Sequence, residues 1–211
     1  MVSVYRREDI GTSYKELIDL IHESFEERLA QGLVFSTSSM TEEEYVADTR
    51  GGTIYVAIDE DLKTLVGTAF VKIRSDEQGT IYGGLEYCAV KNEYKHKGIG
   101  TMLFKVIEQH TIDAEGEYIL SDTSVSAKSS VRYHLKNGFK IVGLESYMST
   151  NYYSYVFRKQ LKPSRFWDNQ LLVKCRFILS CIYKIIEKRR NGRFTILGKL
   201  MKKIKKCVNC L

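Results

Sequence analysis

The sequence has one proline, one tryptophan and no long uncharged apolar run among its 211 residues. Without such a run, the chain has no candidate for a membrane-spanning helix of about 20 apolar residues. The polar start, MVSVYRREDIG, lacks the apolar centre of a signal peptide, so we expect a cytoplasmic protein. With 44% hydrophobic and 11% aromatic residues, the chain can nevertheless fill a substantial core.

The cysteines also lack the spacing of a complete metal site. Of the five cysteines, only Cys207 and Cys210 form a Cys-x-x-Cys pair. Structural zinc needs four ligands, and no second pair of ligands accompanies this one. We therefore predict no metal site and leave the role of this pair open.

Acidic residues are almost missing from the last fifty positions. Residues 162–211 contain fourteen of the 32 lysines and arginines but only two of the 26 acidic residues, which leaves 1–161 with eighteen basic and twenty-four acidic residues. The single proline, Pro163, lies where the composition changes. We predict a domain over 1–161 and a basic tail over 162–211.

Periodicity within 1–161 predicts a mixed α/β (α+β) fold with a mostly antiparallel sheet flanked by helices. The expected order is a strand, a helix over 13–30, a capped helix starting at Thr41, and an antiparallel meander of three strands. A helix, a strand, a helix over 127–136 and two further strands follow. The expected strands span 3–7, 52–60, 65–75, 80–90, 117–123, 138–147 and 151–161.

Between the meander and the next helix lies EYKHKGIGTMLF, a basic turn that contains two glycines. Gly98 and Gly100 allow a close backbone approach, and the first amides of a helix favour an anion, as do neighbouring lysines. The spacing matches neither the Walker A motif nor the three-glycine dinucleotide fingerprint. An ordinary helix start with solvated lysines would give the same pattern, so the spacing alone leaves both readings open.

With the preceding strand, this stretch reads AVKNEYKHKGIGTMLF and resembles the acetyl-CoA loop of the GNAT superfamily of N-acetyltransferases, Gln/Arg-x-x-Gly-x-Gly/Ala. Lys95 occupies the Gln/Arg position. The resemblance covers roughly residues 2–161 and implies acetyl-CoA as co-substrate, with its pyrophosphate on the loop amides. The residues that it places at the cofactor are Cys88, Ala89, Val90, Lys95, His96, Lys97, Gly98, Ile99, Gly100 and Thr101.

The same resemblance implies that an amine attacks the thioester directly, aided by a base and an acid. The family often carries the base on the strand before the loop, where Glu86 is the only carboxylate. Simple alternation puts Glu86 and Tyr87 on opposite faces, so only one of them can face the cleft, unless Gly83-Gly84 marks a bulge. The alternatives are that Glu86 is a solvated acid and that water is the base.

For the acid, the family often has a tyrosine four residues before the glycine of a final Gly-Phe. Here that position is His134, and Tyr133 is one residue too early. A histidine also stands there in acetyltransferases of the phosphinothricin type, so we expect His134, or Tyr133 beside it, to protonate the departing thiolate. Packing roles for both side chains are the alternative.

The acceptor is less well defined by the sequence. The segment ERLAQGLVFSTSSMTEEEY contains Glu26, Glu27 and the consecutive acids 42–44, which suit a cationic amine but equally suit a solvated, capped helix. We expect a primary amine, with an amino sugar of a surface-polysaccharide precursor as the first candidate. A protein or peptide amine, and a non-catalytic CoA-binding module, remain alternatives, and a homodimer stays open.

Two amphipathic helices are expected in the tail. The first, over 169–188, has one apolar stripe of Leu171, Cys175, Ile178, Ile182 and Ile185. In the second, Phe194, Leu197, Met201 and Ile204 form one face and lysines occupy the rest. This pattern favours an anionic membrane surface, so we expect a peripheral location at the inner membrane face. Packing on the domain is the next alternative, and nucleic acid is disfavoured because aromatic residues and arginines do not alternate with the lysines.

Overall fold

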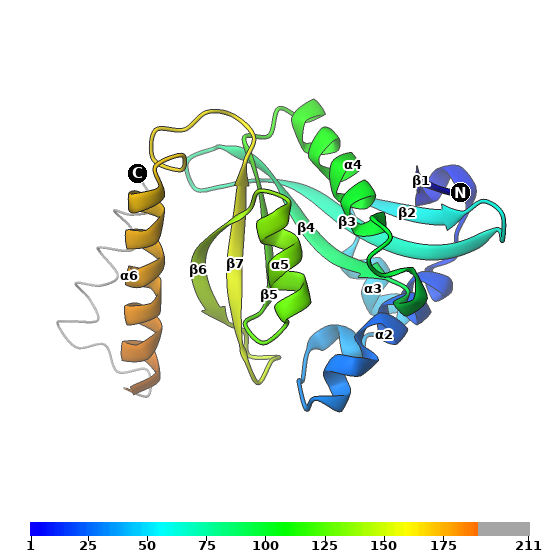
Figure 1. The fold of residues 1–211 in the computed structure, drawn as a ribbon, viewed down its shortest axis with the longest axis horizontal. Coiled ribbons are helices and arrows are strands. Elements are labelled where there is room, and N and C mark those ends of the chain that lie inside the picture. Colours follow the sequence, from blue (N-terminus) through cyan, green and yellow to red (C-terminus); the bar gives the residue numbers. More distant parts are fainter. Residues whose placement is uncertain (190–211) are drawn as a thin grey trace. The chain divides into compact units, whose positions relative to one another are not determined.

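The computed structural model describes residues 1–189. Backbone contacts divide the chain into two units. The first comprises Met1–Ser121 and Met148–Tyr152, and the second comprises the remaining residues from Asp122 onward. The expected fold class is confirmed, since the chain contains a seven-stranded, mostly antiparallel sheet together with helices (Figure 1).

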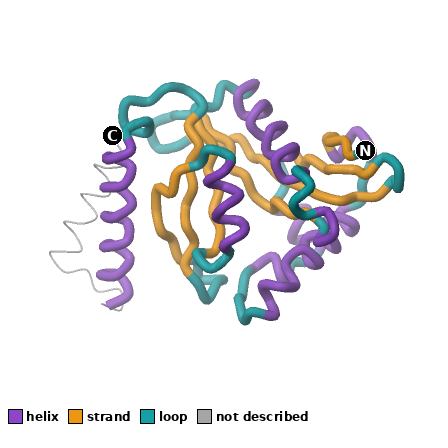
Figure 2. The backbone as a smooth tube through the Cα atoms, in the orientation of Figure 1, coloured by secondary structure: helices purple, strands orange, loops and turns teal. Residues whose placement is uncertain are grey.

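The first unit begins with β1 (Val2–Arg6), α1 (Arg7–Ile10), α2 (Tyr14–Ala30), η1 (Ser36–Ser38) and α3 (Glu42–Asp48). It continues with β2 (Thr53–Asp59), β3 (Thr64–Ser75), β4 (Ile81–Val90), η2 (Asn92–Tyr94), α4 (Ile99–Asp113) and β5 (Tyr118–Ser124), within which the boundary to the second unit falls. The predicted meander is confirmed because β1 to β4 pair antiparallel in order (Figure 2). The short helices α1, η1 and η2 were not predicted.

Helices cover both faces of the meander. Gly67 and Gly83 lack side chains where α4 passes, and a Cβ on Gly83 would lie 2.3 Å from Oγ1 of Thr111. On the other face, α2 and α3 enclose a buried cluster that includes Leu17, Tyr45 and Phe70. The expected capping box of α3 is present, since Thr41 Oγ1 accepts a hydrogen bond from the Glu44 amide at 3.2 Å and the Glu44 carboxylate accepts one from the Thr41 amide.

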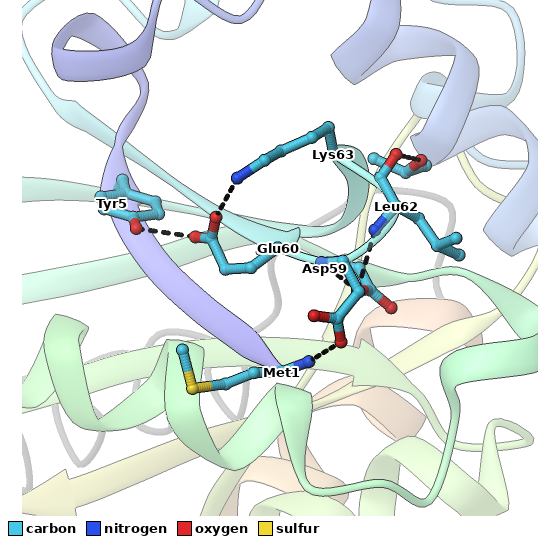
Figure 3. A network of polar contacts seen from close by, with 8 residues as sticks. Met1, Tyr5, Asp59, Glu60, Leu62 and Lys63 are labelled. Atoms are coloured by element: carbon cyan, nitrogen blue, oxygen red, sulfur yellow. Dashed lines mark hydrogen bonds and ion pairs between the residues drawn. The ribbon is translucent and has the colours of Figure 1, made fainter.

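A polar network joins β1 to the turn between β2 and β3 (Figure 3). The Tyr5 hydroxyl donates to Glu60 at 2.7 Å, and Lys63 lies 3.0 Å from the other oxygen of that carboxylate. Asp59 accepts hydrogen bonds from the amides of the turn. The network fixes the end of β2, which is the end that faces the glycine-containing loop, as described below.

The second unit contains α5 (Lys128–Lys136), β6 (Lys140–Ser146), β7 (Tyr153–Gln160) and α6 (Gln170–Arg189). The strands β6 and β7 pair antiparallel. Between them and α5, the His134 imidazole stacks on Phe157, with ring centroids 4.4 Å apart, and meets the edge of Phe139. These rings form the core of the unit.

The first tail helix packs on β6. Ser180 Oγ accepts a hydrogen bond from the Leu144 amide at 2.9 Å, and the Lys184 ammonium lies 2.8 Å from the Glu145 carboxylate. The second unit therefore contains α6 together with β6 and β7, whereas the boundary predicted at residue 162 separates α6 from these strands. That boundary stays a prediction.

The second predicted tail helix, around Phe194 to Ile204, lies outside the described residues, as do Cys207 and Cys210. Over residues 1–189, none of the helices combines the length and the apolar character that crossing a bilayer requires.

Candidate active site

The glycine-containing loop forms the start of α4. Gly98 is the N-cap and has a φ of 85°, a left-handed conformation that favours glycine. The space beside Gly98 is open, because a Cβ at this position would meet no atom within 4 Å. No side chain caps this helix start, and a helix leaves its first amides without partners inside the helix. The site therefore offers amide donors and a helix dipole to an anion.

Contacts with β2 and β3 hold the loop in place. The Tyr94 hydroxyl donates to Asp59 at 2.8 Å, and the Lys91 amide donates to the Val66 carbonyl at 3.0 Å. The Tyr94 hydrogen bond lowers the pKa of Asp59, and the same bond raises the pKa of the phenol. The Lys97 ammonium lies 4.6 Å from the centre of the Tyr94 ring. These contacts therefore fix the start of the basic loop to β2 and β3.

Within β4, the structure places a bulge at Tyr87 rather than at the two glycines. Gly83 and Gly84 pair regularly with Ile73 and Lys72, whereas the register shifts between the pairs Phe70↔Glu86 and Thr68↔Ala89. Tyr87 has a φ of 51°, which is rare for a residue with a side chain. An extra residue in a strand breaks the alternation of faces.

This bulge places Glu86 and Tyr87 on the same face of β4. Glu86 pairs with Phe70, and the Tyr87 ring packs 6.1 Å from the Phe70 ring and 5.1 Å from the Tyr45 ring. The expectation that only one of the two can face a cleft was therefore wrong, because it assumed simple alternation. Both side chains lie on the face that α2 and α3 cover.

Glu86 forms an ion pair with Arg74 of β3, with 2.6 Å between Nη1 and Oε1. Both side chains are about one-third exposed, at 36%. The guanidinium occupies the space above Gly84, where a Cβ would lie 2.1 Å from Nη1. Gly84 therefore lets Arg74 reach Glu86, a role that the sequence did not reveal.

Tyr87 is held by Asp48 at the end of α3, with 2.6 Å between its hydroxyl and the carboxylate. Burial, and then this hydrogen bond, raises the pKa of Tyr87 well above its ordinary value. Burial likewise raises the pKa of Tyr45, which is fully buried beside it. Both phenols stay protonated in the neutral range. Asp48 and Tyr45 were missed because neither belongs to a motif.

The end of β4 extends past its parallel ladder with β5. Its parallel ladder with β5 covers the residue pairs from Tyr82↔Tyr118 to Gly84↔Leu120, and Glu86 to Val90 lie beyond it. Ala89 is buried, Cys88 and Val90 are partly exposed, and the Val90 carbonyl accepts a hydrogen bond from Ser24 of α2 at 3.2 Å. This stretch runs directly into the loop, as expected for a strand that contacts a cofactor.

Among the other predicted cofactor residues, Ile99 is buried under the loop, Gly100 and Thr101 are partly exposed, and Lys95 closes η2. His96 is exposed and has a φ of 65°. The fit to a diphosphate is therefore good, since amides, an open glycine and basic side chains converge.

His134 and Tyr133 belong to α5 in the second unit. His134 is buried and its Nδ1 lies 2.8 Å from the Ser130 carbonyl. A carbonyl only accepts, so Nδ1 carries the proton. Tyr133 is half-buried and meets the edge of the imidazole. The role of the two side chains as acids stays a prediction. The aromatic packing of His134 also matches the alternative, which is a packing role.

The acidic segment is mostly accounted for locally. Glu44 completes the capping box, and Glu42 and Glu43 are exposed in the first turn of α3, where carboxylates favour the helix dipole. Within residues 1–189, His, Cys, Asp and Glu side chains form no group that could hold a metal ion.

Comparison with known proteins assigns the family. The sequence matches the Acetyltransferase (GNAT) family over residues 14–139, and no curated protein matches it. Among solved structures, the fold is similar to PaiA N-acetyltransferase from Thermoplasma acidophilum in complex with coenzyme A, at 18% identity and a TM-score of 0.57, covering 76% of this chain and 99% of that one.

Two further structures are similar. A GNAT-family acetyltransferase from Staphylococcus aureus Mu50 has 17% identity and a TM-score of 0.56, covering 77% of this chain and 100% of that one. The ribosomal-protein-S18-alanine N-acetyltransferase from Escherichia coli has 10% identity and a TM-score of 0.59, covering 78% and 96%.

The chain belongs to the GNAT acetyltransferase family. It is an acetyl-CoA-dependent N-acetyltransferase, as the resemblance of the loop implied.

Proposed function

We propose that the chain transfers the acetyl group of acetyl-CoA to a primary amine, with Glu86 as the base. The observation that carries this assignment is the position of Glu86, one residue before the bulge at Tyr87, with a side chain that is about one-third exposed and close in sequence to the cofactor loop. Acetyl-CoA supplies a thioester that an amine can attack.

The loop binds the pyrophosphate. The first amides of α4 donate hydrogen bonds to its oxygens, Gly98 leaves room for a close approach because it has no side chain, and Lys95 and Lys97 add positive charge. Tyr94, through Asp59, keeps the loop in its binding conformation.

Glu86 removes a proton from the incoming ammonium or amine. Arg74 orients the carboxylate through their ion pair. Tyr87 and Tyr45 stay neutral in the neutral range and line the same face with apolar ring surface. We assign the return of a proton to the thiolate to His134, with Tyr133 beside it.

The first candidate for the acceptor is an amino sugar of a surface-polysaccharide precursor. It is supported by the location that we propose for the chain, at the inner face of an anionic membrane, where such precursors are assembled. The basic charge of residues 162–211 supports that location. A protein or peptide amine is the second candidate, favoured by the similarity to the ribosomal-protein-S18-alanine N-acetyltransferase.

Thiol release from acetyl-CoA tests the function directly. The full chain is assayed against free and nucleotide-linked amino sugars, polyamines and peptides with a free N-terminus, with Glu86→Gln as the matched control. We expect turnover with an amino sugar and a loss of about a hundredfold in Glu86→Gln at neutral pH. Binding of acetyl-CoA without turnover on any amine would instead support the non-catalytic module.

A further inference from the structure

Helix α6 has one face that packs on β6 and an opposite face that is exposed. The face that packs on β6 holds Val173, Ser180 and Lys184, of which Lys184 is only 8% exposed. Its contacts include an ion pair and hydrogen bonds between the Ser180 hydroxyl and both backbone groups of Leu144. The packed face therefore combines apolar contacts, such as that of Phe177 with Tyr155 at 6.0 Å between ring centroids, with polar ones.

The opposite face is apolar and exposed. Its members follow one another at spacings of four, three, four and three residues, which gives a straight stripe along about four turns. The stripe, which we call the outer stripe, consists of Leu171, Cys175, Ile178, Ile182 and Ile185. Leu171 is 69% exposed, Ile178 is 54% exposed and Ile185 is 53% exposed.

This arrangement leaves a second apolar row of the helix outside the core, in addition to the apolar residues that pack inward. A surface helix normally turns its apolar stripe to the core and leaves lysine outside. Here Lys184 points inward to Glu145 while Ile182 and Ile185 point outward. Scattered exposed apolar residues are common, but an aligned row of large side chains marks a surface that contacts a partner.

The charge of the tail sequence favours one kind of partner. Residues 162–211 carry fourteen basic and two acidic residues in the sequence, and on α6 the exposed Lys174 lies beside the stripe. A second copy of this chain would bring the same excess of positive charge against itself. An anionic lipid surface offers apolar depth for the stripe and negative charge for its surroundings.

We propose that α6 is an interfacial membrane helix, which lies flat on an anionic bilayer with the outer stripe between the headgroups. Its 20 residues extend for about 30 Å, all in the plane of the surface. The face that packs on β6 keeps the helix attached to the domain, so that the helix docks without unfolding. The proposal is independent of the acceptor and of catalysis.

Vesicle co-sedimentation of the full chain tests this proposal. The probes are vesicles of phosphatidylcholine alone and of phosphatidylcholine with about a third phosphatidylglycerol. We compare the unaltered chain with Ile178→Ser/Ile182→Ser. The matched control is Ile112→Ser/Leu62→Ser, which alters exposed apolar residues of the first unit (47% and 67% exposed).

We expect binding to the anionic vesicles only, weakened at least about tenfold by the double change in the outer stripe and unchanged in the control. Vesicle binding of Ile178→Ser/Ile182→Ser should still weaken as the salt concentration rises, because salt screens the charges and this variant retains all of them. Unchanged vesicle binding in Ile178→Ser/Ile182→Ser would overturn the assignment of the stripe. Absence of binding at low salt would overturn the membrane reading. In that case, a dimer in sedimentation velocity that the double change abolishes would identify a second copy as the partner instead.

Discussion

Arg74 and Glu86 are joined across β3 and β4 by an ion pair of 2.6 Å, one residue before the bulge at Tyr87. Because the guanidinium lies over Gly84, the pair depends on a position without a side chain. The ion pair therefore fixes the position of the Glu86 carboxylate. Arg74 is therefore a positioning residue for the proposed base.

The first prediction concerns kcat. Replacing Arg74 by Gln removes the ion pair that orients Glu86, so kcat should fall while the Kd for acetyl-CoA stays unchanged. The fall should stay within about fivefold, as expected for a partly exposed pair. Thiol release from acetyl-CoA at saturating substrate and calorimetry check the two quantities.

A second variant acts on the same pair through the neighbouring backbone position. The Cβ of Gly84→Ala would lie 2.1 Å from Nη1 of Arg74 and should displace this flexible group, lowering kcat in the same way. Lys72→Gln is the control, because Lys72 lies on the same face but donates to the Arg50 carbonyl. An equal fall of kcat in Lys72→Gln would show a general charge effect rather than an effect of the pair.

The second prediction concerns the loop. Gly98→Ala and Gly98→Glu carry the same backbone strain at a φ of 85°, but only Glu adds negative charge beside the pyrophosphate. Calorimetry should show acetyl-CoA binding weakened about tenfold by Ala and by at least about a further tenfold by Glu. Equal affinities of the two variants would contradict an anion at this helix start.

Several of these features were predictable from sequence and several were not. Periodicity and capping signals predicted the meander, α2, α3 and α4 to within a few residues, since each is long and strongly patterned. The bulge was placed wrongly because Gly83-Gly84 is the stronger local signal, whereas those glycines serve close contacts with Thr111 and Arg74.

The tail illustrates a different limit. Periodicity identified the apolar stripe of α6 correctly, but it does not determine which face of the helix packs on the domain. The packed face is selected by contacts with β6 through Ser180 and Lys184, and these pairings depend on tertiary structure. Arg74 and Asp48 were missed for the same reason, because their partners Glu86 and Tyr87 are distant in sequence.

The third prediction concerns the support of the loop. Tyr94→Phe removes the hydrogen bond to Asp59 and should raise the Kd for acetyl-CoA about threefold to tenfold, with kcat at saturation unchanged. Tyr5→Phe is the matched control, since its hydroxyl binds Glu60 in the neighbouring network of Figure 3. A fall in kcat alone would contradict a role in positioning the loop.

The fourth prediction concerns stability. Burial, and then the charge of Arg6, lowers the pKa of His110, whose Nδ1 lies 3.0 Å from the Tyr55 hydroxyl. The unfolded state then binds more protons than the folded state, so the free energy of unfolding should fall as pH drops below about 6.5. In His110→Gln this contribution disappears, and denaturant titrations at pH 5 and pH 8 should differ less than in the unaltered chain. Parallel losses in both proteins would contradict the assignment.

The last prediction separates chemistry from packing at His134. The ring stacks on Phe157 at 4.4 Å and meets Phe139, so His134→Ala would open a cavity and confuse the two effects. His134→Phe keeps an aromatic ring in the stack and removes the ability to transfer a proton.

If His134 protonates the thiolate, His134→Phe should retain the melting temperature to within a few degrees and lower kcat about a hundredfold. Its Kd for acetyl-CoA should change little. Tyr133→Phe is the matched control, which removes one hydroxyl from the half-buried neighbour. If Tyr133→Phe alone loses activity, the tyrosine is the acid. If both variants keep full kcat, both side chains have packing roles and water protonates the thiolate.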